Sequence, residues 1–243
     1  NVTAGEGSTV TLYTHLKSAE EDTTALRLLI NLEKNAKLRL VELLEPGKNG
    51  VLVHDLGGTV GENADIAVLH LYLGSGDIDS GCRMDLMGEK ANFTYQAGYL
   101  GKKHQKLDVN LIANHFGKNT TCNIRADGTL KDQAEKTFRG TIDFKKGCKG
   151  SVGAEQENVL LLGEEIVNKT IPLILCAEED VQGDHGATIG ELDEDTLFYF
   201  AARGMDSVTA ENLLTREKLY RLAEAMGRED VVELARNAIQ EVL

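Results

Sequence analysis

The sequence predicts a mainly β protein with a short helical region at its C-terminal end. Strand-like segments recur at intervals of roughly 12 to 16 residues through most of the chain, and turn signals rich in Gly or Pro separate them. After Ala177 the apolar spacing changes from the period of strands to the period of helices. We therefore expect a β core domain over residues 1–190 and a helical region over residues 191–243.

The first expected strands are Thr9–Leu16, Ala25–Leu32 and Ala36–Leu44. The third also fits a helix on propensity, but Leu38 and Leu40 alternate with other residues at period two, which favours a strand. The later expected strands are Val51–His54, Ala67–Leu73, Gly81–Leu86, Ala91–Leu100, Lys106–Asn114, Thr120–Ala126, Arg139–Phe144, Gly150–Ala154, Val159–Leu162 and Ile171–Cys176. The turn signals between them include Pro46-Gly47 and Asp127-Gly128.

The order of the strands limits the architecture. No amphipathic helices lie between these segments, so a doubly wound α/β sheet is not expected. A sandwich, a barrel and a β-solenoid all remain open. Short, evenly spaced strands favour the solenoid over the sandwich, because each coil of a solenoid stacks on the next.

Four helices are expected after Leu192. Asp193 is a suitable N-cap for the first, two acidic residues follow in the first turn, and Gly204 is expected to end it. The second begins at Ser207 or Thr209 and runs through Leu214, the third covers Thr215–Met226, and the fourth covers Asp230–Val242. Helices this short are expected to pack on the strands, on one another or on a partner.

The charge and the termini indicate where such a protein acts. The net charge is −13, and phosphate backbones and anionic membranes bind clustered basic side chains, so neither nucleic acid nor a membrane is expected as a partner. No apolar run is long enough to span a bilayer, and Asn1–Gly5 does not resemble a signal peptide. We expect a cytoplasmic protein with reduced cysteines, and interpret the missing initiator Met as a start inside a longer protein.

Two residues are candidates for chemistry. His185 lies between an acidic residue and a glycine, and its imidazole could ligate a metal or transfer a proton. The residue type alone favours a structural histidine at the junction of strand and helix. Cys176 is the cysteine nearest to it in sequence and could supply a thiolate, although a small buried apolar residue is the simpler interpretation.

The remaining motifs define no catalytic site. The other histidines share no metal-ligand spacing and are expected to be ordinary surface or core residues: His15, His54, His70, His104 and His115. The sequence contains neither a phosphate-binding P-loop nor a Gly-x-Ser-x-Gly elbow. From the residues alone, the function therefore stays open.

The region from Ala177 to Gly204 resembles the signature of the SufB/SufD family, the scaffold subunits of the SUF iron–sulfur cluster assembly system. The matching segments are Ala177–Val181, His185–Gly190, Asp193–Asp195, Leu197–Phe200 and Ala202–Gly204, and together they are more similar to SufD than to SufB. Weaker matches upstream follow the family's order: Asp127-Gly128, Phe138–Ile142, Ala154–Leu162 and Pro172.

This resemblance implies a right-handed parallel β-helix followed by a helical C-terminal region. It implies a non-catalytic scaffold that pairs with a SufB/SufD-type subunit, as a hetero- or homodimer, through the last coils. It also implies a SufC-type ATPase bound at the C-terminal helices. The expected docking residues are Leu197, Phe198, Tyr199, Arg203 and Gly204.

The resemblance further implies that His185 is an iron ligand at the subunit interface, where a transient iron–sulfur cluster is shared with the partner. Cys176 is the second candidate ligand. Gly183 stands where SufD sequences carry a cysteine, so the sulfur ligands are expected on the partner chain. Longer members carry a helical domain before the β-helix that this sequence does not match, so we expect either a shortened SufD-like branch or a SufB/SufD homologue that pairs with itself or with another short subunit.

Two other functions are compatible with a β-helix. A polysaccharide-active enzyme would need aromatic residues for sugar stacking, and aromatic residues make up only 5% of this chain. The other is a plain protein-interaction module in which His185 is purely structural.

Overall fold

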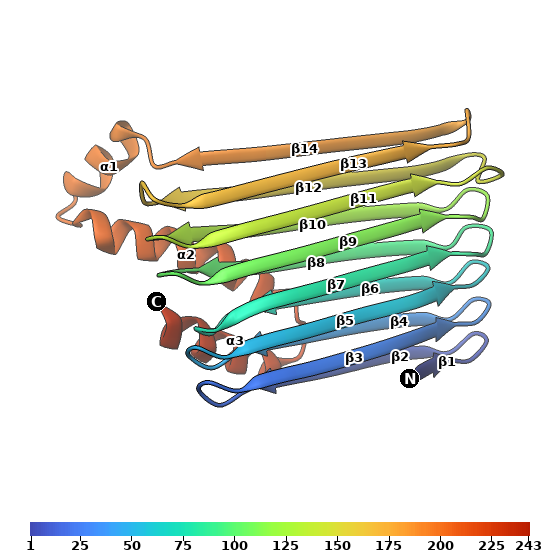
Figure 1. The fold of residues 1–243 in the computed structure, drawn as a ribbon, viewed down its shortest axis with the longest axis horizontal. Coiled ribbons are helices and arrows are strands. Elements are labelled where there is room, and N and C mark those ends of the chain that lie inside the picture. The colour runs from blue at the N-terminus through green and yellow to red at the C-terminus, as the bar shows by residue number, and fades with distance from the viewer.

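The computed structural model describes residues 1–243 and consists of two parallel sheets that face each other, with three helices at one side (Figure 1). Each sheet has seven strands, in the orders β1-β3-β5-β7-β9-β11-β13 and β14-β12-β10-β8-β6-β4-β2. Successive strands alternate between the sheets, so each coil adds one strand to each of them. The protein is therefore a parallel β-solenoid of about seven turns, and the sandwich and the barrel are excluded.

The odd-numbered strands form one sheet: β1 (Val2–Ala4), β3 (Thr23–Leu32), β5 (Val51–Val60), β7 (Asp77–Leu86), β9 (Lys106–His115), β11 (Glu135–Phe144) and β13 (Val167–Cys176). The even-numbered strands form the other: β2 (Thr9–Lys17), β4 (Lys37–Glu45), β6 (Asp65–Tyr72), β8 (Asn92–Gly101), β10 (Thr121–Lys131), β12 (Ser151–Leu162) and β14 (Val181–Glu191). In most cases the strands extend beyond the predicted segments, because the parallel ladder continues through polar and glycine positions that interrupt the local pattern.

The length of one coil varies along the solenoid. Val51 of β5 pairs with Asp77 of β7, which is 26 residues later, and Glu135 of β11 pairs with Val167 of β13, which is 32 residues later. Two strands per coil agree with the predicted strand spacing. Asparagines at successive turns take a left-handed backbone, as at Asn35 (φ 59°) and Asn63 (φ 53°), a conformation that asparagine tolerates better than most residues. The Asn63 side-chain amide donates to Asn35 Oδ1 at 2.8 Å, so the turns also stack.

The main core lies between the two sheets. Leu38, Leu40 and Leu44 of β4 point into it, whereas Val41 and Leu43 point outward and are buried under the helices. Burial on both faces explains why this strand is so rich in leucine that it also fits a helix on propensity.

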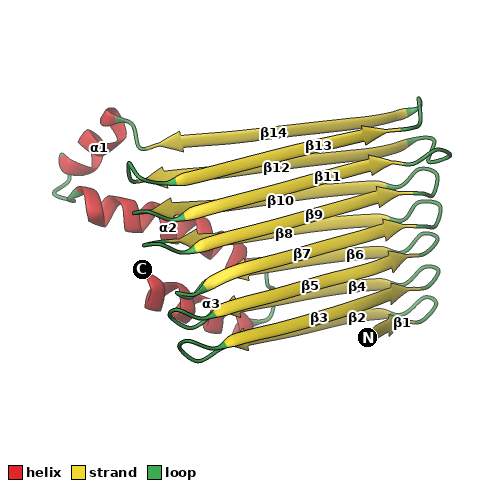
Figure 2. Cartoon of the chain, in the orientation of Figure 1, coloured by secondary structure: helices red, strands yellow, loops and turns green.

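Three helices follow the solenoid: α1 (Glu194–Ala201), α2 (Ser207–Glu224) and α3 (Glu229–Val242) (Figure 2). Asp193 caps α1, as predicted, by accepting from the Thr196 N–H at 2.6 Å. Helices α2 and α3 pack on the outer face of the even-numbered sheet, where Leu219 and Ile239 contact the buried cluster that includes Leu43 and Leu71. Helix α1 buries none of its residues.

Three predictions about elements were wrong. The second and third expected helices are one helix, α2. No glycine or proline lies at the expected boundary between Leu214 and Thr215, and Thr215 is itself buried. The expected strands Gly150–Ala154 and Val159–Leu162 are one strand, β12, whose inward positions between them are Glu155 and Glu157.

The third error concerns Asp127-Gly128, which lies inside β10 rather than in a turn. A Cβ on Gly128 would lie 2.0 Å from Cε2 of Tyr99 on the neighbouring coil. The glycine therefore makes room for a buried aromatic ring and does not reverse the chain.

Candidate functional site at the open end of the solenoid

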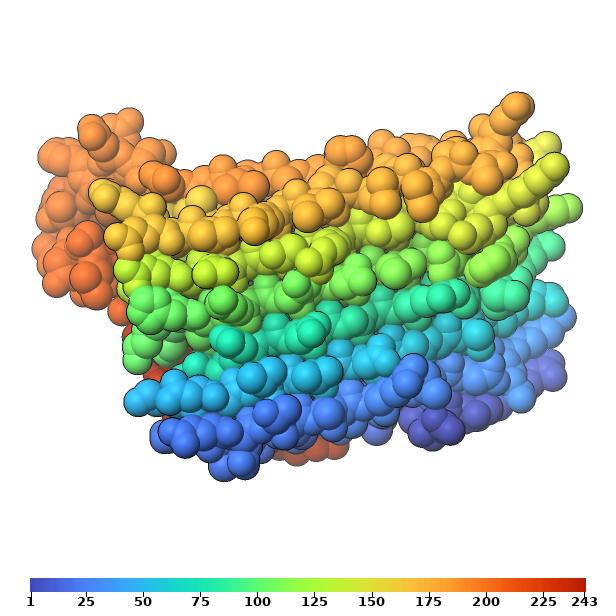
Figure 3. Space-filling model, in the orientation of Figure 1, coloured from blue at the N-terminus to red at the C-terminus, as the bar shows by residue number.

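The last coil of the solenoid carries no further coil. Strands β13 and β14 stand at the ends of their two sheets, and they form the upper edge of the molecule in Figure 3. Nearly all residues of β14 are exposed, and so are Ile171, Leu173 and Leu175 of β13, each with 43–48% of its surface accessible. The free edge of each strand offers backbone N–H and C=O groups, which can pair with another strand, and the three apolar side chains of β13 lie beside this edge on the outer face of the sheet.

His185 lies in the middle of this open end. In the ladder it pairs with Glu155 of β12, whose side chain is buried and points between the sheets. Val181 of β14 also packs against the main core, so this alternate set of β14 residues faces inward. His185 therefore occupies the inward position next to Glu155 on the last coil and is itself exposed.

Gly183 occupies the next inward position, nearer the turn that joins β13 to β14. A Cβ on this glycine would lie 3.1 Å from both Ile174 and Phe144, so a larger residue would fit only if these side chains moved by a few tenths of an ångström. Cys176 is exposed and pairs with Phe144, and its Sγ–H donates to the Glu178 carbonyl at 2.9 Å. Since Ile174 lies opposite Gly183, Cys176 lies closer to the turn than His185 does, and the two candidates occupy different levels of the coil.

Buried charges lie directly beneath this coil. Lys136 and Glu157 are almost fully buried and form an ion pair between the sheets. Glu157 also accepts from the hydroxyl of Tyr99 at 2.8 Å and from that of Thr170 at 2.5 Å. Burial lowers the pKa of Lys136, while the charge of Glu157 opposes this effect. These hydrogen bonds to the ion pair help to offset the free-energy cost of removing both charges from water.

Glu155 completes this group of acids and bases. Burial, followed by the charge of Glu157, raises its pKa to about 7, although Lys136 acts in the opposite direction. Its Oε2 atom is buried without a hydrogen-bond partner. A Cβ on Gly140 would lie 2.2 Å from the Glu155 carboxyl carbon, so this glycine leaves the space that the carboxyl fills. A carboxyl group whose pKa lies near neutrality can take up or release a proton near neutral pH.

The residues expected to dock an ATPase lie on and after α1. Phe198 and Tyr199 are exposed, with accessible fractions of 74% and 52%, while Leu197 is half-buried. The Arg203 guanidinium lies over the Tyr199 ring at 3.5 Å from its centroid, and Gly204 takes a left-handed backbone with φ 78°. Adjacent exposed aromatic residues on a helix with no buried residue are typical of a contact surface.

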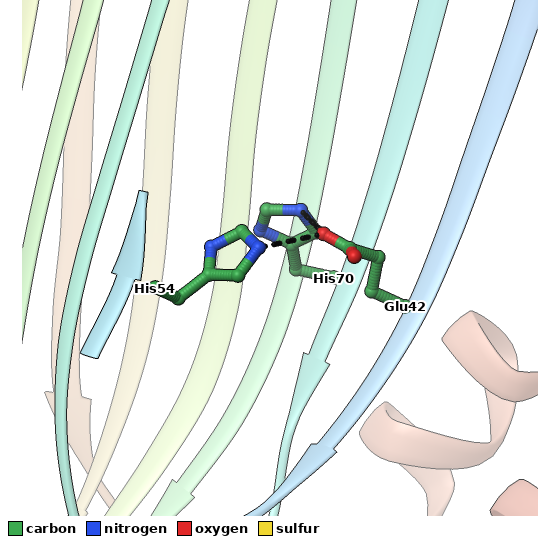
Figure 4. A group of neighbouring side chains, drawn as sticks. All are labelled: Glu42, His54 and His70. Atoms are coloured by element: carbon green, nitrogen blue, oxygen red, sulfur yellow. Dashed lines mark ion pairs between the residues drawn. The ribbon is translucent and has the colours of Figure 1, made fainter. Parts of the chain in front are cut away.

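Figure 4 shows a second cluster, which the sequence interpretation missed. Glu42, His54 and His70 meet inside the solenoid, far along the chain from His185, and none of the three side chains is accessible. The length of one coil is the signal that could have revealed this cluster. It decides which residues stack, and it makes Glu42 and His70 register partners in β4 and β6. Their spacing matches no local ligand motif, since the turns and the ladder decide which residues stack.

The open end thus combines an exposed terminal coil, a histidine on that coil and buried charges beneath it. The family model described as "SUF system FeS cluster assembly, SufBD core domain" matches residues 1–218. The chain therefore belongs to the SufBD family of iron–sulfur cluster assembly proteins, as its resemblance to that family predicted.

Individual relatives agree with this assignment. The chain is 26% identical to the iron–sulfur cluster assembly protein SufD of Bacillus subtilis over 162 residues, which cover 67% of this chain and 37% of the relative. It is 25% identical to SufD of Escherichia coli over 230 residues, which cover 92% of this chain and 53% of the relative. A SufBD family protein of Mycobacterium tuberculosis is 26% identical over 164 residues, which cover 19% of that protein. The chain thus spans about half or less of the length of these relatives. None of its helices has the length and apolar character needed to cross a membrane.

Proposed function

We propose that this chain is a non-catalytic scaffold subunit for iron–sulfur cluster assembly. In this proposal it pairs with a SufB/SufD-type subunit through its last coil and binds a SufC-type ATPase through its C-terminal helices. The observation that carries the proposal is the uncovered last coil of a SufBD-family solenoid, which presents His185 over Glu155.

Pairing through the last coil is supported by its free edges. An exposed parallel edge with apolar side chains is a liability unless a partner covers it. Ile189, on the inward set of β14, is 47% exposed and stands at this uncovered end. A second subunit of the same fold would supply both the strand edges and the apolar surface to bury it.

Cluster binding would use His185 as one iron ligand, since a neutral imidazole is a suitable donor for iron. Gly183 offers no thiolate beside it, so the partner would supply sulfur ligands. Cys176 is an exposed thiol at the same end and is the other candidate from this chain. Glu155 would accept or release the proton that accompanies ligand binding.

Anaerobic reconstitution of the complex with iron and sulfide tests the role of His185. We expect the His185→Ala complex to retain less iron and acid-labile sulfide than wild type, while the His104→Ala control, altered at an exposed turn, retains as much. Equal cluster content in the His185→Ala and wild-type complexes would refute the proposed ligand.

Docking of the ATPase is tested by co-purification. We expect Phe198→Ser to weaken the association with a SufC-type ATPase by at least tenfold, because truncating an exposed aromatic residue at the centre of an interface costs about 2 kcal/mol. Met87→Ser is the matched control, since Met87 is also exposed (52%) but lies in the turn after β7. The proposed surface is wrong if both variants bind as wild type does.

A further inference from the structure

The cluster of Glu42 (β4), His54 (β5) and His70 (β6) has the composition of a metal site. Its side chains reach toward one another from three strands inside the solenoid (Figure 4). Glu42 Oε2 lies 3.0 Å from His54 Nε2 and 2.8 Å from His70 Nε2. One donor atom from each residue lies within 4.8 Å of the other two, and all three side chains are fully buried.

The only basic groups paired with the Glu42 carboxylate are the two imidazoles, and no lysine or arginine forms an ion pair with it. An ionised carboxylate in a fully buried position needs a cation or a complete set of hydrogen bonds. Both histidine Nε2 atoms approach the same oxygen, Oε2 of Glu42, yet these two nitrogens and both carboxylate oxygens are buried without a hydrogen-bond partner. Buried polar atoms are seldom left without a partner, so these four atoms mark a position that a bound cation would complete.

A second layer of hydroxyl groups holds the two imidazole rings. His70 Nδ1 lies 2.8 Å from the Tyr72 hydroxyl and 3.0 Å from the Tyr95 hydroxyl, and His54 Nδ1 lies 3.3 Å from Ser80 Oγ. Each hydroxyl oxygen can accept from a protonated Nδ1, which leaves the lone pair of Nε2 directed at the centre of the cluster. Metal-bound histidines are oriented in this way by outer hydrogen bonds.

We propose that Glu42, His54 and His70 bind one divalent transition-metal ion, such as Zn²⁺ or Fe²⁺, as a structural centre inside the solenoid. Two imidazole nitrogens and one carboxylate oxygen suit these borderline ions. Ligand distances of about 2.0–2.1 Å separate tetrahedral donors by roughly 3.3 Å, so each imidazole needs to move away from the carboxylate by only a few tenths of an ångström. Because the site is enclosed, the ion is taken up as the chain folds.

This site is independent of the proposed assembly function. His185 lies on β14, at the far end of the same sheet from β4, so the two sites share no residues. The test uses a background with His185→Ala and Cys176→Ser, which removes the candidate ligands at the open end. If this background protein binds no metal at the internal site, the proposed role in cluster assembly is unaffected. Likewise, loss of cluster assembly would not count against the internal site.

The experiment unfolds this background protein with a chelator and refolds it with Zn²⁺, Co²⁺ or neither. We expect about one Zn²⁺ per chain after desalting, a higher midpoint of thermal unfolding with the metal than without it, and visible absorption typical of nitrogen- and oxygen-ligated Co²⁺. Glu42→Gln keeps the size of the side chain and should lose the bound metal and the shift of the midpoint. His104→Gln is the matched control and should keep both.

The proposal is overturned if the refolded protein retains no metal and its unfolding midpoint is the same with and without Zn²⁺. The three residues would then form only a buried hydrogen-bond network. If Glu42→Gln does not fold, the Co²⁺ spectrum of the parent background decides the question, because imidazole ligation changes both its position and its intensity. Metal that is retained equally by Glu42→Gln would also overturn the assignment.

Discussion

Lys136, Glu155 and Glu157 show how single residues shape this solenoid. Each lies at an inward position where the preceding coil places an apolar side chain, and each is almost fully buried. Lys136 and Glu157 compensate each other, whereas Glu155 has no basic partner of its own and its pKa rises to about 7. One group of buried charges therefore lies beneath the coil that carries His185, and a second, formed by Glu42, His54 and His70, lies several coils away.

Gly128 provides a prediction about packing. Gly128→Ala should destabilise the protein by about 1–3 kcal/mol, because the added methyl group would overlap the buried ring of Tyr99. Gly190→Ala is the matched control in another strand, since nothing lies within 4 Å of the position its Cβ would take. Urea unfolding of both variants measures the difference. Equal stability of the two would show that the Tyr99 ring moves aside without cost.

His115 provides a prediction about pH. Burial lowers its pKa from 6.5 to about 4, and the charge of Asp143 only partly opposes this. The unfolded chain therefore binds the proton more readily than the folded chain, so stability falls as the pH falls from 6.5 towards 4. We expect this histidine to cost about 2 kcal/mol on going from pH 7.5 to pH 5.

The check is to measure unfolding free energies of wild type and His115→Asn at both pH values. Asn keeps a polar atom near Thr120, which now lies 2.7 Å from His115 Nδ1, but it does not titrate. Between pH 7.5 and pH 5, the unfolding free energy of wild type should fall by about 2 kcal/mol more than that of His115→Asn. A difference that is independent of pH would contradict the assignment.

At the scale of elements, β14 and α1 have the least internal support. Strand β14 pairs with β12 on one side only, and α1 buries no residue. Both segments nevertheless take regular structure, because the ladder continues through β14 and Asp193 caps α1. Elements that are ordered but uncovered are suited to binding other chains.

Gly183 provides a prediction about β14 that depends on the proposed function. Gly183→Cys should increase the iron and acid-labile sulfide retained after anaerobic reconstitution, because it places a thiol one inward position from His185. The fit is tight but feasible, since Ile174 and Phe144 lie 3.1 Å from the new Cβ. Gly190→Cys is the matched control, with its thiol on the outward set of the same strand. No gain over this control in a folded Gly183→Cys protein would argue against a cluster beside His185.

At the scale of the whole molecule, the solenoid is a stack in which each coil is stabilised mainly by the coils next to it. The stability of such a stack is close to a sum of neighbour terms, so an end coil is the first to open. Helices α2 and α3 cover strands of the even-numbered sheet away from β14, and they reinforce the coils that hold Glu42 and His70.

Hydrogen exchange should reveal this gradient. Backbone amides of β13 and β14 are expected to exchange faster than those of β6 and β8, because only one side of the last coil is stacked. Binding of a second subunit at the open end should slow exchange in β13 and β14 selectively. Mass spectrometry of peptides from the free and the bound protein measures both effects. Equal protection along the free solenoid would contradict the expected gradient.

Most of the strands, the C-terminal helices and the family could be predicted from the sequence because their signals are local, whereas β14, the strand that carries His185, was interpreted as a junction between strand and helix. Alternation at Leu38 and Leu40 and the cap at Asp193 each depend on residues a few positions apart, and the motif around His185 is contiguous. The register of distant coils, by contrast, depends on turn lengths, which vary between coils. Only the folded chain could therefore place His185 over Glu155, bring Lys136 to Glu157, and close Glu42, His54 and His70 into one buried cluster.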